Sequence, residues 1–268
     1  MATSYPTPGR GERGMTMFMR FVQFKIKSNF FRYFKDFFQQ EVIPPLKATP
    51  GCHFVGLIQG THQPEECVFL TLWQSFASAE AFEKSQSFSA VIEKARPYLA
   101  ESAEWKVQLG RDMRLEYRPT PEEPVFKQLS VTEGVKAPEE KPGPAERIHV
   151  RIVAARIQRG KMAEFRRLYR RVILTSLKKT PGCRFAFLTE NLQEDEEILS
   201  ITIWDSLADA RNYESSGQFG ALVRRVQHTF AGLYRWKMAL EKDHPMEIVT
   251  TADLTVSHYN LVTGQRFS

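Results

Sequence analysis

The sequence predicts an α+β protein: two tandem ferredoxin-like domains that form an intramolecular pseudo-dimeric α+β barrel. The first observation behind this is a repeat, because Thr49–Cys52 recurs letter for letter as Thr180–Cys183, an offset of 183 − 52 = 131 residues. The second is that aromatic markers keep the same offset, and the third is that both copies show the order β-α-β-β-α-β. A register this constant indicates duplication of one globular unit rather than a solenoid. The aromatic markers are Trp73 and Trp204, Trp105 and Trp236, Phe54 and Phe185.

The first copy opens with Phe18–Lys27, whose alternating, aromatic-rich pattern predicts a strand with one buried face. Apolar spacing then predicts a helix from about Phe30 to Lys47, with Asn29 as its expected cap. Pro44-Pro45 should distort or end this helix. Its aromatic residues are spread too widely for one narrow inner stripe, so some of them should face a partner, a cavity or the tail.

The Thr-Pro-Gly turn leads into a predicted hairpin, because proline fixes φ and glycine permits conformations that other residues resist. Its strands are Cys52–Gln59 and Cys67–Trp73, and a second helical region follows from about Ala79 to Leu99, with Ser75 or Ser78 as the cap. A last strand, Glu104–Leu109, should close the unit. The second copy repeats this order with His149–Ile157, a helix from about Met162 to Lys179 after a turn at Gly160, Cys183–Glu190, Glu197–Trp204, a helical region over Asp209–Leu233 and a closing strand Tyr234–Leu240.

The pattern divides the chain into five parts. Residues 1–16 are expected to be a flexible arm and 17–110 the first domain. Residues 111–146 are predicted to be a Pro-rich, semi-rigid linker with one short strand at Val125–Val131. Residues 147–242 form the second domain, and the tail 243–268 alternates enough over Leu254–Leu261 to be an added edge strand.

Packing logic favours contact between the two copies. A four-stranded sheet with both helices on one side leaves its other face bare, and that face is often covered by a symmetric partner. Fusing both halves makes the partner intramolecular, at high effective concentration. The two sheets are therefore expected to pack against each other.

Composition sets broad limits on function. The chain has 268 residues, 42% hydrophobic and 25% charged, with a net charge of +6, which is compatible with an anionic partner without requiring one. Three cysteines without a CxxC pair argue against a disulfide framework or a zinc site and favour a reducing compartment. The start of the chain has no secretory pattern, and no apolar run reaches the length of a bilayer span, so a cytoplasmic location is expected.

The hairpin and the helical region after it carry a family resemblance. Val68–Ser75 with Ala79–Phe82 and Phe88, and the repeat Leu199–Ser206 with Tyr213 and Phe219, resemble the antibiotic biosynthesis monooxygenase (ABM) superfamily of dimeric α+β barrels. The resemblance covers both repeats but neither the linker nor the two ends. It implies one of two chemistries: oxidation of aromatic polyketides without metal or flavin in a helix–sheet pocket, or haem degradation.

The residues argue against the second chemistry. The resemblance implies that a haem-degrading member uses a strand-1 Asn, the Trp of Trp-x-Ser and an iron-ligating His. The position of that His falls on Ile92 and Val223, which cannot ligate iron. Strand 1 offers Arg20, Gln23 and Arg151 but no Asn. No cofactor and no metal are therefore expected, and the catalytic residues stay unknown.

Under the first chemistry, the resemblance points to aromatic residues as pocket walls. The alternative for the tryptophans is a role as core anchors at strand ends. The pocket candidates are Trp73, Phe82, Phe88, Trp204, Tyr213 and Phe219.

Cysteines and histidines look structural. Cys52 and Cys183 begin strands, and a nucleophilic cysteine would need a lowered pKa and a nearby base. His53 adjoins Cys52 but should point to the opposite face of the strand. The histidines show no metal-like spacing and do not pair across the repeats, so surface or linker positions are expected for all six. They are His53, His62, His149, His228, His244 and His258.

The first helices of the two copies differ, which raises a second hypothesis. The helix of the first copy, about Phe30 to Lys47, is aromatic, and that of the second copy, about Met162 to Lys179, is basic. The basic helix is either an ordinary solvated face or a docking surface. The aromatic helix is either covered by the chain's own linker or a docking surface. An acidic protein or an anionic membrane surface would suit the basic helix, whereas no RNA-binding motif supports nucleic acid. The hypotheses that stay open are an oxygenase or binder of an aromatic molecule, and a non-catalytic scaffold or accessory subunit. The docking candidates are Phe31, Tyr33, Arg166, Arg167, Arg170 and Arg171.

Overall fold

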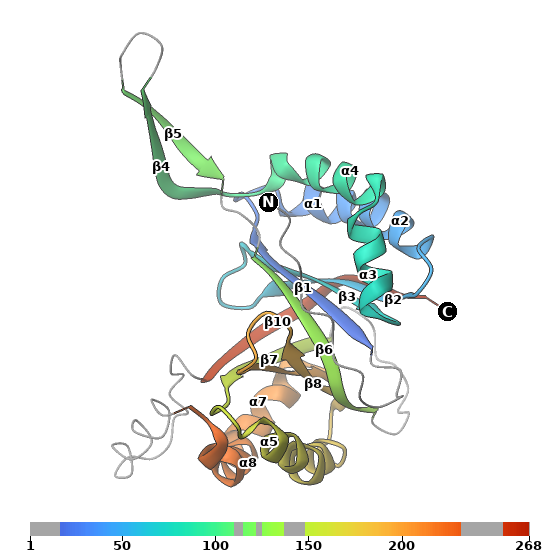
Figure 1. Cartoon of the computed structure of the whole chain (residues 1–268), viewed down its shortest axis with the longest axis vertical. Coiled ribbons are helices and arrows are strands. Elements are labelled where there is room, and N and C mark those ends of the chain that lie inside the picture. Colours follow the sequence, from blue (N-terminus) through green and yellow to red (C-terminus); the bar gives the residue numbers. More distant parts are fainter. Residues whose placement is uncertain (1–16, 110–114, 122–124, 137–147, 232–253, 268) are drawn as a thin grey trace.

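Two helix-covered halves stand on opposite ends of a strand barrel (Figure 1). The structure is a computed structural model that describes residues 17–109, 115–121, 125–136, 148–231 and 254–267. The first half comprises β1 (Phe18–Lys25), α1 (Phe31–Phe37), the π-helical stretch η1 (Phe38–Val42), α2 (Ile43–Lys47), β2 (Cys52–Gly60), β3 (Glu66–Trp73), α3 (Phe76–Glu83), α4 (Gln86–Ala95) and the 3₁₀ turn η2 (Arg96–Tyr98).

The second half repeats this order, and four further strands join or flank the halves. The second half comprises β7 (His149–Arg156), α5 (Met162–Leu168), the π-helical stretch η4 (Tyr169–Leu174), α6 (Thr175–Leu177), β8 (Cys183–Asn191), β9 (Glu197–Trp204), α7 (Leu207–Ser215), α8 (Gln218–Val226) and η5 (Gln227–Thr229). The further strands are β4 (Glu101–Leu109), β5 (Leu115–Pro121), β6 (Val125–Lys136) and β10 (Leu254–Arg266).

The barrel is closed in the order β1-β3-β2-β10-β7-β9-β8-β6. Two strands cross between the halves: β6 pairs with β1 and then with β8, whereas β10 pairs with β7 and then with β2. Both crossing strands change register at equivalent irregularities, between Val131 and Glu133 and between Leu261 and Thr263. The predicted pseudo-dimeric barrel is confirmed.

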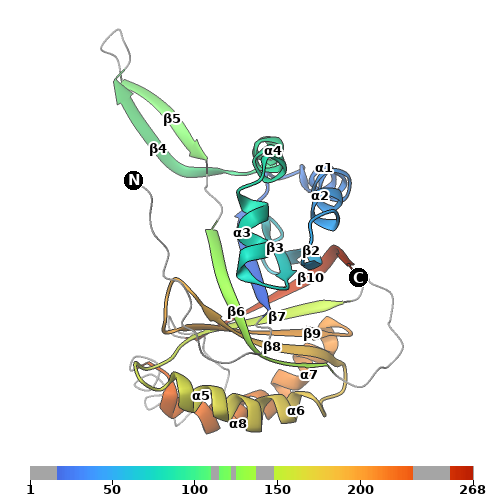
Figure 2. The same ribbon diagram turned by 45° about the vertical axis from the view of Figure 1, so that its right-hand side comes forward.

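The strands that close each half differ from the prediction. Glu104–Leu109 lies in β4, which pairs with β5 as a separate two-stranded sheet that projects from the barrel (Figure 2). The place beside β1 is taken by β6, from the predicted linker, whose Leu129 is fully buried in the barrel. The tail strand β10 is not an edge strand, because it has a neighbour on each side. The predicted strand Tyr234–Leu240 and the arm 1–16 lie outside the described residues.

Strand alternation separates three apolar layers. On β1, Phe18, Val22 and Phe24 face the helices of the first half, whereas Met19 and Phe21 point into the barrel. The barrel interior forms one cluster shared by both halves, and each helix pair covers a cluster of its own. Each half therefore has a separate helix–sheet layer in which a site can develop.

Of two local predictions about the first helix, the one for Pro44-Pro45 holds only in part, because the helix is distorted but does not end there, and the one for Asn29 is wrong. The chain stays helical through Pro44-Pro45 to Lys47, with η1 before the prolines. The second half has the equivalent η4 although Thr175 and Ser176 replace the prolines, so proline is not required for the π-helical stretch. Asn29 does not cap α1; it adopts a left-handed conformation (φ 72°), as does Gly160 131 residues later (φ 81°).

The repeated turn is set by glycine, as predicted. Gly51 and Gly182 have φ of 83° and 76°, a region that favours glycine. An added Cβ would lie 2.7 Å from Ser78 Oγ at the first and 2.6 Å from Asp209 Cβ at the second. Ser75 caps α3, as Ser206 caps α7 in the other half. Within the described part of the chain, no helix is long and apolar enough to cross a membrane.

Candidate functional site

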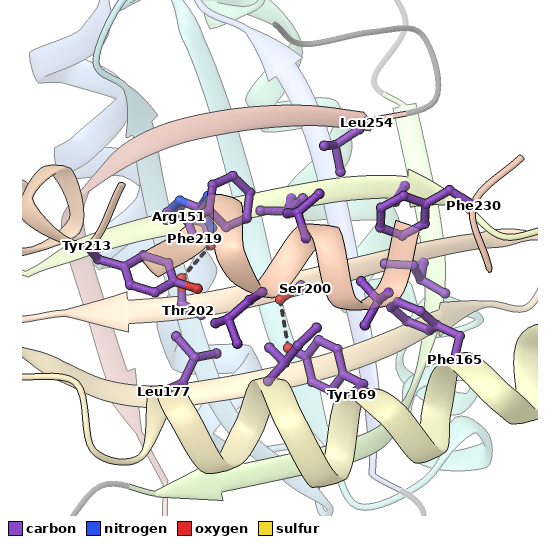
Figure 3. Close-up of a pocket in the computed structure, with 17 residues that line it drawn as sticks. Arg151, Phe165, Tyr169, Leu177, Ser200, Thr202, Tyr213, Phe219, Phe230 and Leu254 are labelled. Atoms are coloured by element: carbon purple, nitrogen blue, oxygen red, sulfur yellow. Dashed lines mark hydrogen bonds between the residues drawn. The ribbon is translucent and has the colours of Figure 1, made fainter. Parts of the chain in front are cut away.

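A cavity of about 40 Å³ lies in the helix–sheet layer of the second half (Figure 3). Residues of β7 and β9 form its floor, and α5, η4 and α8 form its walls. Most of the lining is apolar. The polar members are Arg151, Tyr169, Ser200, Thr202 and Tyr213.

Helix α8 supplies one complete wall of this cavity. Four of its five buried residues line it: Phe219, Leu222, Val223 and Val226. The helix starts after Gly217, whose φ is 78° and whose Cβ position has no atom within 4 Å. Val223 is the position at which the resemblance would place an iron-ligating His, and a valine side chain has no ligand atom.

Arg151 brings a cation to the cavity. Its side chain is 2% exposed, and its Nε donates a hydrogen bond to Glu214 Oε1 at 2.6 Å. The guanidinium carbon lies 4.0 Å from the centroid of the Phe219 ring, within the range of a cation–π contact. Its buried Nη2 has no hydrogen-bond partner among the described residues.

A chain of polar side chains continues from this ion pair to the C-terminal strand β10. Glu214 Oε1 lies 3.3 Å from His258 Nε2, and His258 Nδ1 lies 2.9 Å from His149 Nε2. His149 Nδ1 in turn lies 3.4 Å from Asn260 Oδ1. The network links α7, β7 and the C-terminal strand β10.

Burial and neighbouring charges set the protonation of this network. Burial lowers the pKa of His149 to about 4, so this imidazole is neutral at neutral pH. Burial alone would raise the pKa of Glu214, but the hydrogen bond from His258 and the charge of Arg151 outweigh it and lower the pKa to about 2. Glu214 is therefore a carboxylate that accepts from two donors.

The expectation that all histidines lie at the surface or in linkers is wrong for two of them. His149 is 0% exposed, and His258 packs on it with ring centroids 5.1 Å apart. No local signal reveals this pair, because the residues are 109 positions apart and meet only through the β7–β10 pairing. His62 and His228 are exposed, as expected, and His244 lies outside the described residues.

The six predicted pocket residues separate by position. Tyr213 and Phe219 line the cavity, and Trp204 lies buried against the ring of Tyr213. In the first half, Phe82 packs between Trp73 and Phe88. Both tryptophans donate from Nε1 to a strand threonine at 2.8 Å, Thr71 and Thr202, as buried core anchors do.

The first half has bulkier side chains at the equivalent positions. Phe24 and Phe69 stand where the second half has Ala155 and Ser200. The centroid of the Phe24 ring lies 5.4 Å from that of Phe34, and the centroid of the Phe69 ring lies 5.6 Å from that of Phe38. In the second half, Ser200 instead hydrogen-bonds the hydroxyl of Tyr169 at 2.7 Å.

The cysteines do not supply a nucleophile. Burial raises the pKa of Cys52, Cys67 and Cys183 to about 12, so each is a thiol at neutral pH. In the described residues, no group of three or more His, Cys, Asp or Glu side chains is arranged to hold a metal ion.

The docking candidates occupy mixed environments. Tyr33 is 63% exposed, whereas Phe31 packs on the core of the first half. Arg166 is held by Glu190 through two hydrogen bonds of 2.8 Å. The side chains of Arg167, Arg170 and Arg171 are exposed.

The fold and the cavity define a tandem dimeric α+β barrel with a helix–sheet pocket in its second half. The chain belongs to the antibiotic biosynthesis monooxygenase family, whose model matches residues 17–94 and 148–225.

Solved structures share this fold at low sequence identity. A candidate monooxygenase from Fusobacterium nucleatum is 9% identical, with 94% of each chain covered and a TM-score of 0.64. A candidate monooxygenase from Lactobacillus acidophilus is 10% identical, with 94% of this chain and 96% of the other covered and a TM-score of 0.57. An anthrone oxidase-like protein is 12% identical, with 94% of each covered and a TM-score of 0.58. No curated protein matches the sequence.

Proposed function

We propose that the second half binds a hydroxylated aromatic or polyketide-like molecule in its helix–sheet cavity and oxidises it with dioxygen, without metal or flavin. The first half is then a scaffold that completes the barrel. The observation that carries this proposal is the asymmetry between the halves: Ala155 and Ser200 border a cavity, whereas Phe24 and Phe69 pack against other rings in the first half. Membership of the family supports the reaction class.

An aromatic ketone of the anthrone type suits this chemistry, and the fold neighbour described as anthrone oxidase-like motivates the choice. Oxidation of its ring-flanked methylene to a carbonyl places one oxygen atom in the product and releases the other as water with the two methylene hydrogens. The substrate supplies all the electrons, so no external reductant is required. The protein has to bind the substrate, favour its enolate and exclude water.

The size of the cavity sets a condition on this proposal. A cavity of about 40 Å³ is far smaller than the ~300 Å³ at the lower end of ligand pockets. Binding therefore requires α8, which carries one wall, to move outward. The left-handed Gly217 between α7 and α8 provides a hinge with open space around it.

The test is oxygen uptake with anthrone as the substrate, using variants that exchange the two layers. Ser200→Phe installs the side chain of the first half in the cavity, and Phe69→Ser is the matched change on the other side. We expect the wild type and Phe69→Ser to consume oxygen and Ser200→Phe to lose nearly all activity. Equal activity in Ser200→Phe would place the reaction elsewhere, and no uptake by folded wild-type protein would end the oxidase proposal.

A second candidate function is a non-catalytic scaffold or accessory subunit. It is favoured by the small size of the cavity and by the exposure of Tyr33 on α1 and of Arg167 and Arg171 on the basic helix. Native mass spectrometry of protein purified gently from its source separates the two candidates. A small molecule lost on denaturation supports the binding function, whereas a stoichiometric protein partner without a ligand supports the scaffold.

A further inference from the structure

One buried cation in the second half, Arg151, has only part of its hydrogen-bond donors paired within the described residues. Arg151 is 2% exposed and lines the cavity, and its Nε is engaged by Glu214. The ring of Phe219 covers the face of the guanidinium. Its Nη2 is left without a hydrogen-bond partner among the described residues, and an unpaired buried donor on a charged group costs free energy.

We propose that Arg151 is the anion anchor of this cavity: its Nη2 binds the deprotonated oxygen of an acidic aromatic hydroxyl, so the site selects aromatic molecules as phenolates or enolates. This inference rests on the binding part of the proposed function and needs no oxidation step. A charge-assisted hydrogen bond is roughly twice as strong as a neutral one, which favours the ionised form of the ligand.

The charges around Arg151 are compatible with binding an anionic ligand in addition to the Glu214 carboxylate. The carboxylate of Glu214 is shared between Arg151 and His258, which packs against it from β10. His149, from the same strand as Arg151, is neutral because burial lowers its pKa to about 4. Burial also raises the pKa of Tyr213, from α7, and that of Cys183, from β8, so neither adds a competing negative charge at neutral pH.

The shape of the cavity adds to the ligand class. Arg151, Tyr213 and Phe219 gather at one end, and Phe165 and Phe230 lie at the other (Figure 3). The far end is apolar, so a second charge there would be buried without a partner. The expected ligand is a planar aromatic molecule with its acidic oxygen at one end and no charge at the opposite end.

The first half offers a matched control. Arg20 occupies the equivalent strand position, is 5% exposed and forms an ion pair with Glu83 over 2.7 Å. Its Nε and Nη2 also lack well-oriented hydrogen bonds, although Nη2 is the atom in the ion pair. The layer beside Arg20 contains the rings of Phe24 and Phe69, so it offers the same charge in a more crowded layer.

The experiment uses 4-nitrophenol, whose phenolate is yellow and whose phenol is nearly colourless, and 4-nitroanisole, which has no acidic hydroxyl. Binding is followed by difference absorption and calorimetry at a pH where free 4-nitrophenol is mainly un-ionised. We expect wild type and Arg20→Met to bind 4-nitrophenol as the yellow phenolate and to bind 4-nitroanisole more weakly. Arg151→Met should lose at least about tenfold in affinity for 4-nitrophenol, and Arg151→Lys should retain part of it.

Each failure has a distinct meaning. If the wild type binds 4-nitrophenol in its colourless, un-ionised form, or binds both probes equally, Arg151 is not an anion anchor. The proposed binding of aromatic molecules would still stand. This reading uses wild-type protein alone, so it holds even where Arg151→Met does not fold. If folded wild-type protein binds neither probe, both the anchor and the binding function fail.

Discussion

The two helix–sheet layers of this protein share one ancestor sequence pattern but differ in what fills them. In the first layer, Phe38 contacts the ring of Phe69, whereas in the second the hydroxyl of Tyr169 bonds Ser200 beside a cavity. The helices that cover the two layers also differ: five residues of α8 are buried, whereas none of α4 is. The barrel contains both sheets, and among the described residues it is the second layer that has a cavity lined by polar side chains such as Ser200 and Tyr169.

The polar groups of the two layers also differ. Both halves keep a strand arginine paired with a helix glutamate, Arg20 with Glu83 and Arg151 with Glu214. In the second half, a pair of histidines adjoins this ion pair, and His149 stands where the first half has Phe18. The Arg–Glu pair is common to both halves of this chain, whereas the His149–His258 pair lies in the half with the cavity.

The largest effect on stability is expected when one of the two strands that cross between the halves is removed. Ending the chain before Leu254 deletes β10, which leaves β2 and β7 without a neighbour on that side. We expect loss of the cooperative thermal transition and self-association, because unpaired edges template pairing between chains. Circular dichroism and sedimentation velocity measure both. The matched core change in β6, Leu129→Ala, should cost about 2–5 kcal/mol and leave the sedimentation coefficient at its wild-type value. A truncated chain with the wild-type sedimentation behaviour and melting temperature would contradict this role of β10.

A smaller effect should be a dependence of folding stability on pH that arises in the second half. The pKa of His149 falls from 6.5 to about 4 on folding, so the unfolded chain binds a proton that the folded chain does not over this interval. Stability is therefore full above about pH 6.5 and lost as the pH falls towards 4, by up to about 3 kcal/mol. Glu214 acts in the same direction at lower pH, between its ordinary value of 4.5 and about 2.

His149→Phe installs the residue of the first half and should flatten the dependence between about pH 6.5 and 4. Urea unfolding at a series of pH values measures the slope in both proteins. An unchanged slope in the variant would mean that other groups cause the acid sensitivity.

The smallest effects concern two glycines of the second half, one that is also glycine in the first half and one that is not. Gly182 is paired with Gly51, whereas Gly160 is paired with Asn29, and all four have positive φ. Gly182→Ala adds a contact of 2.6 Å with Asp209 to the conformational cost, so we expect a loss of more than about 1–2 kcal/mol. Gly160→Asn copies the first half into open space and should change stability by less than about 1 kcal/mol. Equal losses in urea unfolding would show that the contact at Gly182 relaxes without cost.

Much of the fold could be predicted from the sequence because its signals are local or repeated. The constant offset identified two copies, alternation identified their strands, and the Pro-Gly turn required left-handed glycines at Gly51 and Gly182. Ser75 as a helix cap is similarly local, since its hydroxyl accepts from the backbone three residues later. Such features depend on neighbours in the chain and on steric limits of single residues.

The tertiary structure decided which strands meet and therefore where the site lies. The sequence pattern marks β4, β6 and β10 as extended, but hydrogen bonds between strands are not specific to sequence, so it could not tell which of them closes each half. The pairing of His149 with His258, and the unpaired Nη2 of Arg151, follow from that choice. The cavity depends in addition on side-chain volume, because Ala155 and Ser200 become significant only when packed beneath Tyr169 and α8.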